Sequence, residues 1–467
     1  MKLLLLILLI ATDLCAQREP IAFVDVTVVP MDRQGISEHQ TVLVRDGRIQ
    51  EAGPMRSVRL PKGARRIDAK GKFLMPGLTD MHVHFVREPL PEVPPAAPNA
   101  AVRTTGIPAS TSADHERENR AYALMFLANG VTTVRNMWGS PAITAFAKEV
   151  ESGEVPGPHV YSTGPITDGN PPSWFGTRVV ETAAQAEAAV AADKQDGYIA
   201  IKVYSRLSTE AYVAIVAAAR KAGLPVVGHI PFNVGLEGVI AARQDSVEHL
   251  DEFLPSIQPG GRRSQRPALA DAIRDADLTK LPGIGREIAR ANVWVCPTTV
   301  VNDLPRTDPV WLDHAGFVPP AVFERYRRMY PNSNVDPRST PRAHAINLAI
   351  VAALHNAGAQ LLLGTDTVKP GVLPGYSIHD ELSNFVAAGM SPYDAIRAGT
   401  VDAARFLNRS PDFGVIAAGR RADLVLLDGN PLEDVKNTGR ILGVMAMGRW
   451  FTEEELQKRL LALQASY

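Results

Sequence analysis

The stretch "LTDMHVHF", residues 78–85, decides the fold, because it places two histidines one residue apart at the end of an apolar strand. Successive side chains of a strand point to opposite faces, so His82 and His84 lie on the same face. Two neighbouring imidazoles are costly to bury without partners, and a divalent metal ion can bind both. The pair therefore predicts a metal site at the end of a buried strand.

The middle of the chain alternates short apolar runs with Ala-rich helical patterns. Such alternation favours an α/β fold in which parallel strands are covered by helices, and eight strands predict a (β/α)8 TIM barrel over residues 74–411. The expected strands are "GLTDMHVHF", "VTTVRNM", "HVYSTGP", "YIAIKVYS", "PVVGHI", "DSVEHL", "VWVCPTT" and "QLLLGTD". Between some of them lie helix patterns such as "TAAQAEAAVAADKQ", "STEAYVAIVAAARKAG" and "AHAINLAIVAALHNAG".

Both ends of the chain carry short strand patterns punctuated by Gly and Pro. Residues 17–73 include "TVLVRDGRIQEAG", and residues 412–467 include "ADLVLLDG" and "ILGVMAMGRWF". Alternation of apolar and polar residues between turn residues is typical of exposed sheets. We expect the two pieces to form one small β-sandwich domain built from both termini.

The first residues have the pattern of an export signal. Lys2 precedes the apolar run "LLLLILLIA", which is too short to span a bilayer. This predicts a signal peptide over residues 1–16 and a protein that is periplasmic or secreted, while Cys15 leaves a lipid anchor as an alternative. After cleavage Cys296 is the one cysteine left, so no intramolecular disulfide is expected.

The composition describes an ordinary globular protein. It is 45% apolar and 21% charged, with a formal net charge of −1 over 467 residues. This balance lacks the basic excess of a nucleic-acid-binding surface. No later segment has the length and apolarity of a membrane helix, so we expect a small-molecule substrate and no stable membrane insertion after signal removal.

Four more polar residues end predicted strands: Lys202 in "IKVY", His229 in "VVGHI", His249 in "SVEHL" and Asp366 in "LLLGTD". The carboxyl ends of barrel strands build the active site of this fold, so these side chains should meet the histidine pair. Nitrogen and oxygen donors suit Zn²⁺, with Mn or Fe as alternatives. A buried lysine either pairs with a carboxylate, loses its proton, or is modified. The modified form would be a CO₂ adduct, an anion able to bridge two metals.

These residues resemble the metal-dependent amidohydrolase superfamily. The matching blocks are "FLMPGLTDMHVHF", "GVTTVRNM", "GHI", "SVEHL", "GTD", "AGMSPYDAIRAGTVDAARFLN" and "GVIAAGRRADLVLLDGNPLEDVKN". The chain is most similar to the subgroup that contains imidazolonepropionase-related amidohydrolases and Xaa-Pro dipeptidases. Asn136 departs from the pattern, because this group often has Asp there.

The resemblance implies a role for each residue of the predicted site. His82, His84 and Asp366 would hold the more buried of two zinc ions, and His229 and His249 the more exposed one. Carboxylated Lys202 would bridge them. The metals would activate a hydroxide, and Asp366 would act as general base and then acid.

The implied function is hydrolysis of C–N (amide) bonds in small molecules such as dipeptides or N-acyl amino acids. The alternative is a mononuclear hydrolase of cyclic amides, similar to imidazolonepropionase, or a deaminase. In that case Lys202 stays unmodified and His249 acts as a catalytic residue. A non-catalytic barrel is a third reading, and the presence of all six site residues argues against it.

The substrate pocket and the assembly are less defined by the sequence. A long loop is expected at residues 86–118, and further insertions at 255–282 and 302–342. Tyr204, Arg206 and Tyr376 are candidates for holding a substrate carboxylate, and His379 for a supporting role. A homo-oligomer is usual for the family.

Overall fold

The computed structural model describes residues 19–86, 111–259, 268–302, 314–322, 340–367, 369 and 371–467. The expected signal peptide, most of the loop expected at 86–118 and most of the insertion expected at 302–342 therefore lie outside the described residues.

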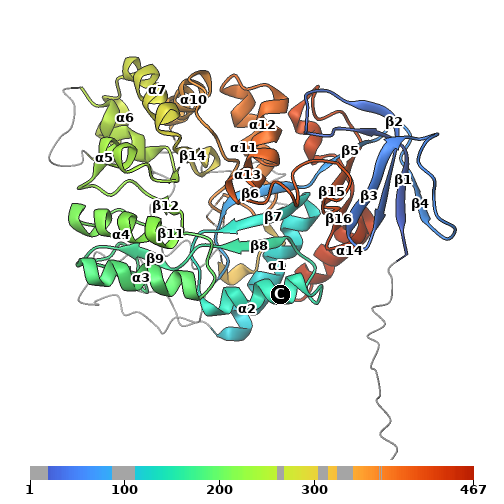
Figure 1. Ribbon diagram of the computed structural model, residues 1–467, viewed down its shortest axis with the longest axis horizontal. Coiled ribbons are helices and arrows are strands. Elements are labelled where there is room, and N and C mark those ends of the chain that lie inside the picture. The colour runs from blue at the N-terminus through green and yellow to red at the C-terminus, as the bar shows by residue number, and fades with distance from the viewer. Residues whose placement is uncertain are drawn as a thin grey trace, which may run out of the picture.

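The centre of the molecule consists of two parallel sheets (Figure 1). Seven of the eight predicted runs form strands of these sheets, whereas the strands at residues 166–168 and 178–179 were not predicted. One sheet has the order β6 (Leu78–Val83), β7 (Val131–Asn136), β8 (His159–Ser162). The other has the order β10 (Arg178–Val179), β9 (Ile166–Asp168), β11 (Ile201–Val203), β12 (Val226–Gly228), β13 (Ser246–Glu248), β14 (Trp294–Cys296).

Individual hydrogen bonds, and not continuous ladders, connect the two sheets. On one side Ile199 donates to the carbonyl of Ser162 at 3.0 Å. On the other side residues 361–367 make single parallel bridges to β14 and β6. The fold is thus of the TIM-barrel type, but the described strands do not pair into the single closed eight-stranded barrel that we predicted.

The expected eighth strand, "QLLLGTD", accounts for this difference. The Asp80 carboxylate accepts from the backbone N–H of Thr365 at 3.0 Å, and Asp366 takes a left-handed backbone with φ 58°. A side-chain acceptor and a left-handed residue both interrupt the regular backbone pairing of a strand.

Helices cover the parallel sheets, and the three quoted helix patterns form α3, α4 and α10. Among the described residues no helix has the length and apolarity to cross a membrane. The helices are α1 (Ser112–Ala128), α2 (Pro141–Glu151), α3 (Ala183–Gln195), α4 (Thr209–Ala222), α5 (Gly235–Ala242), α6 (Leu269–Arg274), α7 (Leu281–Ala291), α10 (Pro341–Asn356), α11 (Ser377–Ala387), α12 (Pro392–Ala398), α13 (Val401–Phe406) and α14 (Glu453–Gln464). Short 3₁₀ turns are η1 (Asp251–Ile257), η2 (Leu278–Lys280), η3 (Thr299–Asn302) and η6 (Val435–Gly439).

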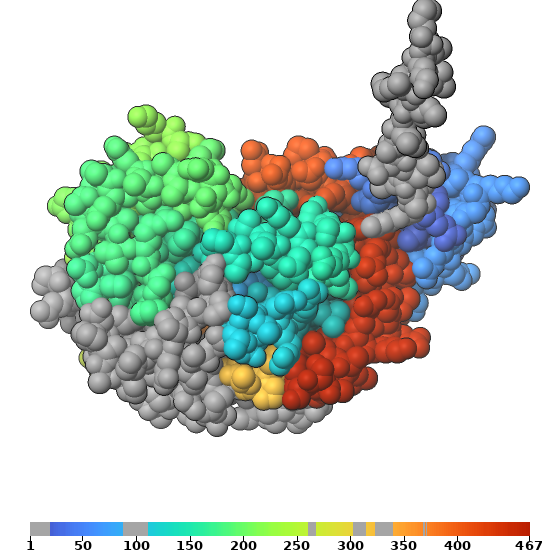
Figure 2. Space-filling model, turned by 90° about the horizontal axis from the view of Figure 1, so that it is seen from below, coloured from blue at the N-terminus to red at the C-terminus, as the bar shows by residue number. Residues whose placement is uncertain are grey.

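Two segments that were not expected to be helical form helices. Residues 112–118, expected within a long loop, belong to α1, which begins at the capping box of Thr111 and Asp114. Residues 453–464, expected within a β-rich end, form α14, which buries Leu456 and Leu460. Figure 2 shows this C-terminal segment (red) beside α1 (cyan), which it contacts.

The two ends of the chain build one eight-stranded sheet, as a shared terminal unit predicts. It is a single rolled sheet and not the sandwich of two sheets that we expected. Ile49 donates to the carbonyl of Arg420 at 2.8 Å and closes the roll around a core that includes Phe23 and Leu424. The order is β17 (Arg449–Thr452), β16 (Ile441–Ala446), β15 (Leu424–Leu427), β5 (Phe73–Pro76), β1 (Ile21–Val28), β2 (Ser37–Arg45), β3 (Arg48–Pro54), with β4 (Arg65–Asp68) also on β1.

A buried ionic cluster joins this sheet to the barrel. His159, the first residue of β8, has Nδ1 at 2.8 Å from a Glu151 oxygen and Nε2 at 3.5 Å from an Asp423 oxygen. Arg421 pairs with Asp423 at 2.8 Å. Burial alone would lower the pKa of His159, but Asp423 and Glu151 together raise it. The doubly protonated imidazolium can donate to both carboxylates, whereas the neutral ring can donate to one.

The cluster predicts a specific dependence of stability on pH. A histidine with a raised folded-state pKa contributes stability in full below about pH 6.5, its unfolded pKa, and loses it as the pH rises through the folded pKa. We expect the free energy of unfolding of the wild type to fall more between pH 6 and pH 9 than that of His159→Asn. Urea denaturation at both pH values measures this, and parallel curves for the two proteins would contradict it.

Candidate metal centre

The structure brings all six predicted site residues together at the carboxyl ends of the parallel strands. Nε2 of His84 lies 3.1 Å from Oδ1 of Asp366, and Nε2 of His82 lies 3.4 Å from the same atom. Nζ of Lys202 lies 3.5 Å from Nε2 of His82. The ring of His249 is 4.6 Å from that of His82 and 4.9 Å from that of His229.

Local backbone structure explains how these side chains converge. Lys202 lies within β11, and His229 and His249 directly follow β12 and β13. His249 and Asp366 both have left-handed backbones, with φ of 72° and 58°. Non-glycine residues in this region are uncommon and costly, and they concentrate at functional sites.

The histidines of the cluster are buried in their neutral form. Burial lowers the pKa of His84 to about 4 and that of His229 to about 3, and it holds those of His82 and His249 well below the usual value. Neutral imidazoles keep the lone pair that a metal requires.

Lys202 and Asp366 are the other two titratable groups of the cluster, and both have a lowered pKa. For the lysine this favours the neutral amine, and for the aspartate it favours the charged carboxylate. Burial lowers the pKa of Lys202 to about 8. Burial alone would raise the pKa of Asp366, but Lys369, which forms a close ion pair with it, and the histidines hold that pKa well below its usual range.

These donors fit a divalent metal. Ligand atoms of His82, His249 and Asp366 all lie within 4.8 Å of one another. They are two imidazole nitrogens and a carboxylate oxygen, the donor types that Zn²⁺ takes in catalytic sites. His84, at 24% side-chain exposure, is the most accessible of the histidines near Asp366. The assignment of each residue as a ligand stays a prediction.

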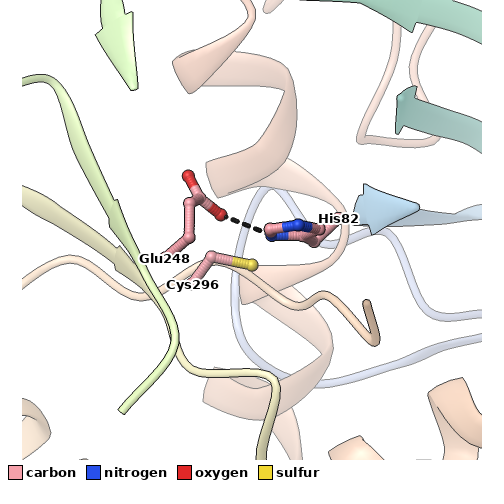
Figure 3. A group of neighbouring side chains, drawn as sticks. All are labelled: His82, Glu248 and Cys296. Atoms are coloured by element: carbon pink, nitrogen blue, oxygen red, sulfur yellow. Dashed lines mark hydrogen bonds and ion pairs between the residues drawn. The ribbon is translucent and has the colours of Figure 1, made fainter. Parts of the chain in front are cut away.

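A second possible donor group lies behind His82. It consists of His82, Glu248 and Cys296, all fully buried (Figure 3). Glu248 accepts from Nδ1 of His82 at 2.9 Å and pairs with the buried Arg135. Sequence reasoning missed Glu248 and Arg135. The available signal was a charged residue inside each of two fully buried strands, β7 and β13.

The other histidines also have partners that the sequence did not identify. Nδ1 of His229 lies 2.8 Å from a Glu252 oxygen. Nδ1 of His249 lies 2.8 Å from the Thr298 hydroxyl. In each case the bond to Nδ1 leaves Nε2 for the cluster. Glu252 lies in the 3₁₀ turn η1 and Thr298 in an irregular segment after β14, so no strand or α-helix periodicity points to them.

The predicted substrate contacts have partners within the protein. Tyr204 is beside the cluster, with its ring 3.9 Å from that of His229. Arg206 donates to the carbonyl of Pro171 at 3.0 Å, and Tyr376 stacks on His314 at 4.0 Å. His379 bonds to Thr438 of η6 at 2.9 Å, so it supports the junction with η6.

Asn136, where the similar group often has Asp, has a structural role. Its Oδ1 accepts from the backbone N–H of Phe85 at 2.9 Å, and its amide donates to Ser162 at 3.0 Å. The residue thus holds the chain directly after His84, and an uncharged amide provides both the acceptor and the donor.

Comparisons with known proteins support this fold. A solved bottromycin amidohydrolase is 25% identical, covers 95% of this chain and 89% of its own, and superposes with a TM-score of 0.72. A Xaa-Pro dipeptidase solved with bound methionine is 19% identical, covers 93% and 100% of the two chains, and has a TM-score of 0.65. Imidazolonepropionase from Geobacillus is 39% identical over 74 residues, 16% of this chain and 17% of that protein.

Matches to curated relatives are local. Their aligned segments span 12 to 17% of the length of those relatives. The resemblance to imidazolonepropionase-related proteins and Xaa-Pro dipeptidases is confirmed by these likenesses. A model of the amidohydrolase family matches residues 73–451, which is most of the chain. The protein is therefore a member of the amidohydrolase family.

Proposed function

We propose that this protein is a metal-dependent hydrolase of C–N amide bonds in small molecules such as dipeptides or N-acyl amino acids. The observation that carries the proposal is the convergence of four neutral histidines, Lys202 and Asp366 at one end of the parallel strands. Members of the family and relatives named for amide hydrolysis or deamination support it. A divalent metal would lower the pKa of water and polarise the scissile carbonyl.

The geometry supports two metal positions in this cluster. We assign His82, His84 and Asp366 to one group, because both histidines approach Asp366. The other group is His229 and His249, whose rings are 4.9 Å apart, and the ring of His249 is also 4.6 Å from that of His82. Lys202, 1% exposed, lies next to both His82 and Tyr204. As an ammonium it would repel a metal held by His82. As a CO₂ adduct it would become an anionic ligand between the two groups, which is why we propose the modified form.

Asp366 is the proposed general base. Its carboxylate is within 3.1 Å of His84 and faces the centre of the cluster. From this position it can take a proton from an attacking water and return it to the departing nitrogen. Lys369 pairs with the same carboxylate and can orient it.

Aromatic side chains beside His229 support a substrate with an apolar part. The Tyr204 ring packs against that of His229 at an angle of 38°, and Nε1 of Trp174 donates to the Tyr204 hydroxyl at 2.8 Å. The ring of Trp138 lies 6.4 Å from that of Trp174. Aromatic rings provide apolar contact with little conformational freedom to lose. A dipeptide or N-acyl amino acid with an apolar side chain matches this surface.

The second candidate is a mononuclear hydrolase of cyclic amides or a deaminase. The local matches to adenine deaminase 2 from Agrobacterium fabrum and to imidazolonepropionase favour it. In this reading Lys202 is an unmodified lysine, and His249, fixed by Thr298, acts on the substrate.

Incubation of the metal-loaded protein with panels of dipeptides, N-acyl amino acids, cyclic amides and purines tests the proposal. Mass spectrometry distinguishes amide cleavage from loss of ammonia. We expect cleavage of linear amides with apolar side chains, and a loss of turnover in His84→Ala. Turnover restricted to cyclic amides or amines would favour the second candidate, and no turnover in any panel would contradict both.

We also propose that the enzyme works outside the cytoplasm, because of the signal pattern at residues 1–16. Expression of the full chain followed by cell fractionation should place the hydrolase activity in the periplasm or the medium, with residues 1–16 absent from the mature protein. Activity confined to the cytosolic fraction would contradict this.

A further inference from the structure

We infer that Arg135 and Glu248 are positioning residues that fix the tautomer and orientation of His82 and direct metal binding away from Cys296. The inference rests on the proposed metal centre. It adds to that proposal by assigning Nε2 of His82 as the ring nitrogen that binds the metal. Neither residue belongs to the six predicted ligands.

The tautomer follows from the chemistry of the pair. A neutral imidazole carries one N–H, and a carboxylate can only accept. The bond of 2.9 Å between Nδ1 of His82 and Glu248 therefore places the proton on Nδ1. Nε2 then carries the lone pair, and it faces Asp366 at 3.4 Å and Lys202 at 3.5 Å. A carboxylate that orients a ligand histidine in this way also increases its basicity.

Arg135 holds Glu248 in place. Its Nη2 donates to both carboxylate oxygens of Glu248, at 2.8 and 2.9 Å, and both side chains are fully buried. Its Nε donates to the carbonyl of Met81 at 2.6 Å, and Nη1 to Ser246 at 3.2 Å. Arg135 thus connects β7, where it lies, with β6, which carries His82, and β13, which carries Glu248.

The same network argues against metal binding at the second donor group. A carboxylate whose oxygens are occupied by Arg135 and His82 is neutralised and is not free to coordinate. Metal ligation needs the thiolate of Cys296. That sulfur is fully buried beside Glu248, whose carboxylate Arg135 already holds. The cation of Arg135 occupies the space beside Glu248, where a metal would experience like-charge repulsion.

A double variant and a matched control test the positioning role. The single change Glu248→Gln is less suitable, because it removes the charged acceptor but leaves Arg135 buried without its carboxylate partner, which can prevent folding. The double variant Arg135→Met/Glu248→Gln removes both charges and keeps the approximate volume. The matched control is Arg178→Met/Asp193→Asn, which removes another ion pair with a fully buried carboxylate, 2.6 Å long, between β10 and α3.

The readouts are the Zn²⁺ affinity of each protein, by competition with a chromophoric chelator, and the absorption spectrum with Co²⁺. We expect the double variant to bind Zn²⁺ about 10- to 100-fold more weakly than wild type and to change the Co²⁺ ligand-field spectrum. The control should match wild type in both. Wild type should show no thiolate-to-cobalt charge-transfer band.

The outcomes separate this inference from the proposed function. Wild-type affinity and spectrum in a folded double variant would overturn the positioning role alone. A thiolate-to-cobalt band that disappears in Cys296→Ser would overturn the assignment of the metal to the Nε2 face. Wild-type protein that binds no metal would overturn the proposed function together with this inference.

Discussion

Replacing Asp366 with Asn is expected to reduce kcat/KM by about 10²- to 10⁴-fold, the range typical of a lost general acid–base group. The amide cannot take a proton from the attacking water, although it keeps nearly the same shape. The measurement is the initial rate of amide cleavage, at saturating Zn²⁺, on the best substrate of the dipeptide panel.

A matched variant shows whether the loss is specific. Asp193→Asn changes another fully buried carboxylate, which pairs with Arg178 and lies outside the site. It should lower stability and leave kcat within a few-fold of wild type. If Asp366→Asn also kept the wild-type kcat at saturating Zn²⁺, Asp366 would not be the base.

Removal of metal with a chelator is expected to abolish turnover and to destabilise the fold. A ligand present at 1,000 times its dissociation constant stabilises the folded state by about 4 kcal/mol. Without metal, the cluster at His82, His84 and Asp366 should lose this contribution. Thermal unfolding and turnover, measured with buffered Zn²⁺ and with chelator, report the two effects, and adding Zn²⁺ back should restore both.

The His84→Ala variant provides the control for this experiment. It should respond less to the chelator in both unfolding temperature and turnover, because a predicted ligand has already been removed. Equal unfolding temperatures and equal turnover of the wild type with and without metal would contradict a metal-dependent enzyme.

Much of the site could be predicted from sequence because its residues end strands of a repeated pattern. His82, Lys202, His229 and His249 lie at or next to the ends of short apolar runs, where a barrel places its active site. The apolar runs can be read from neighbouring residues in the sequence. Once they are assigned to strands of a barrel, the fold class itself predicts that residues more than 100 positions apart come together.

Other features depend on contacts that no periodic pattern encodes. The expected eighth strand fails to form because Asp80, far away in sequence, binds the backbone at Thr365. Glu252 in η1 and Thr298 after β14 orient two histidines, and both lie outside the regular strands and α-helices. The roll of the terminal sheet depends on hydrogen bonds between residues near 49 and near 420. Each is a tertiary contact that overrides local preference.

The most direct test of the metal centre is the metal content per chain of protein purified without added metal, with mass analysis of the peptide that carries Lys202. We predict two metals per chain and a labile CO₂ adduct on Lys202. One metal with an unmodified lysine would contradict the binuclear site and support the mononuclear candidate. No metal, in protein that stays folded and active, would contradict the account as a whole.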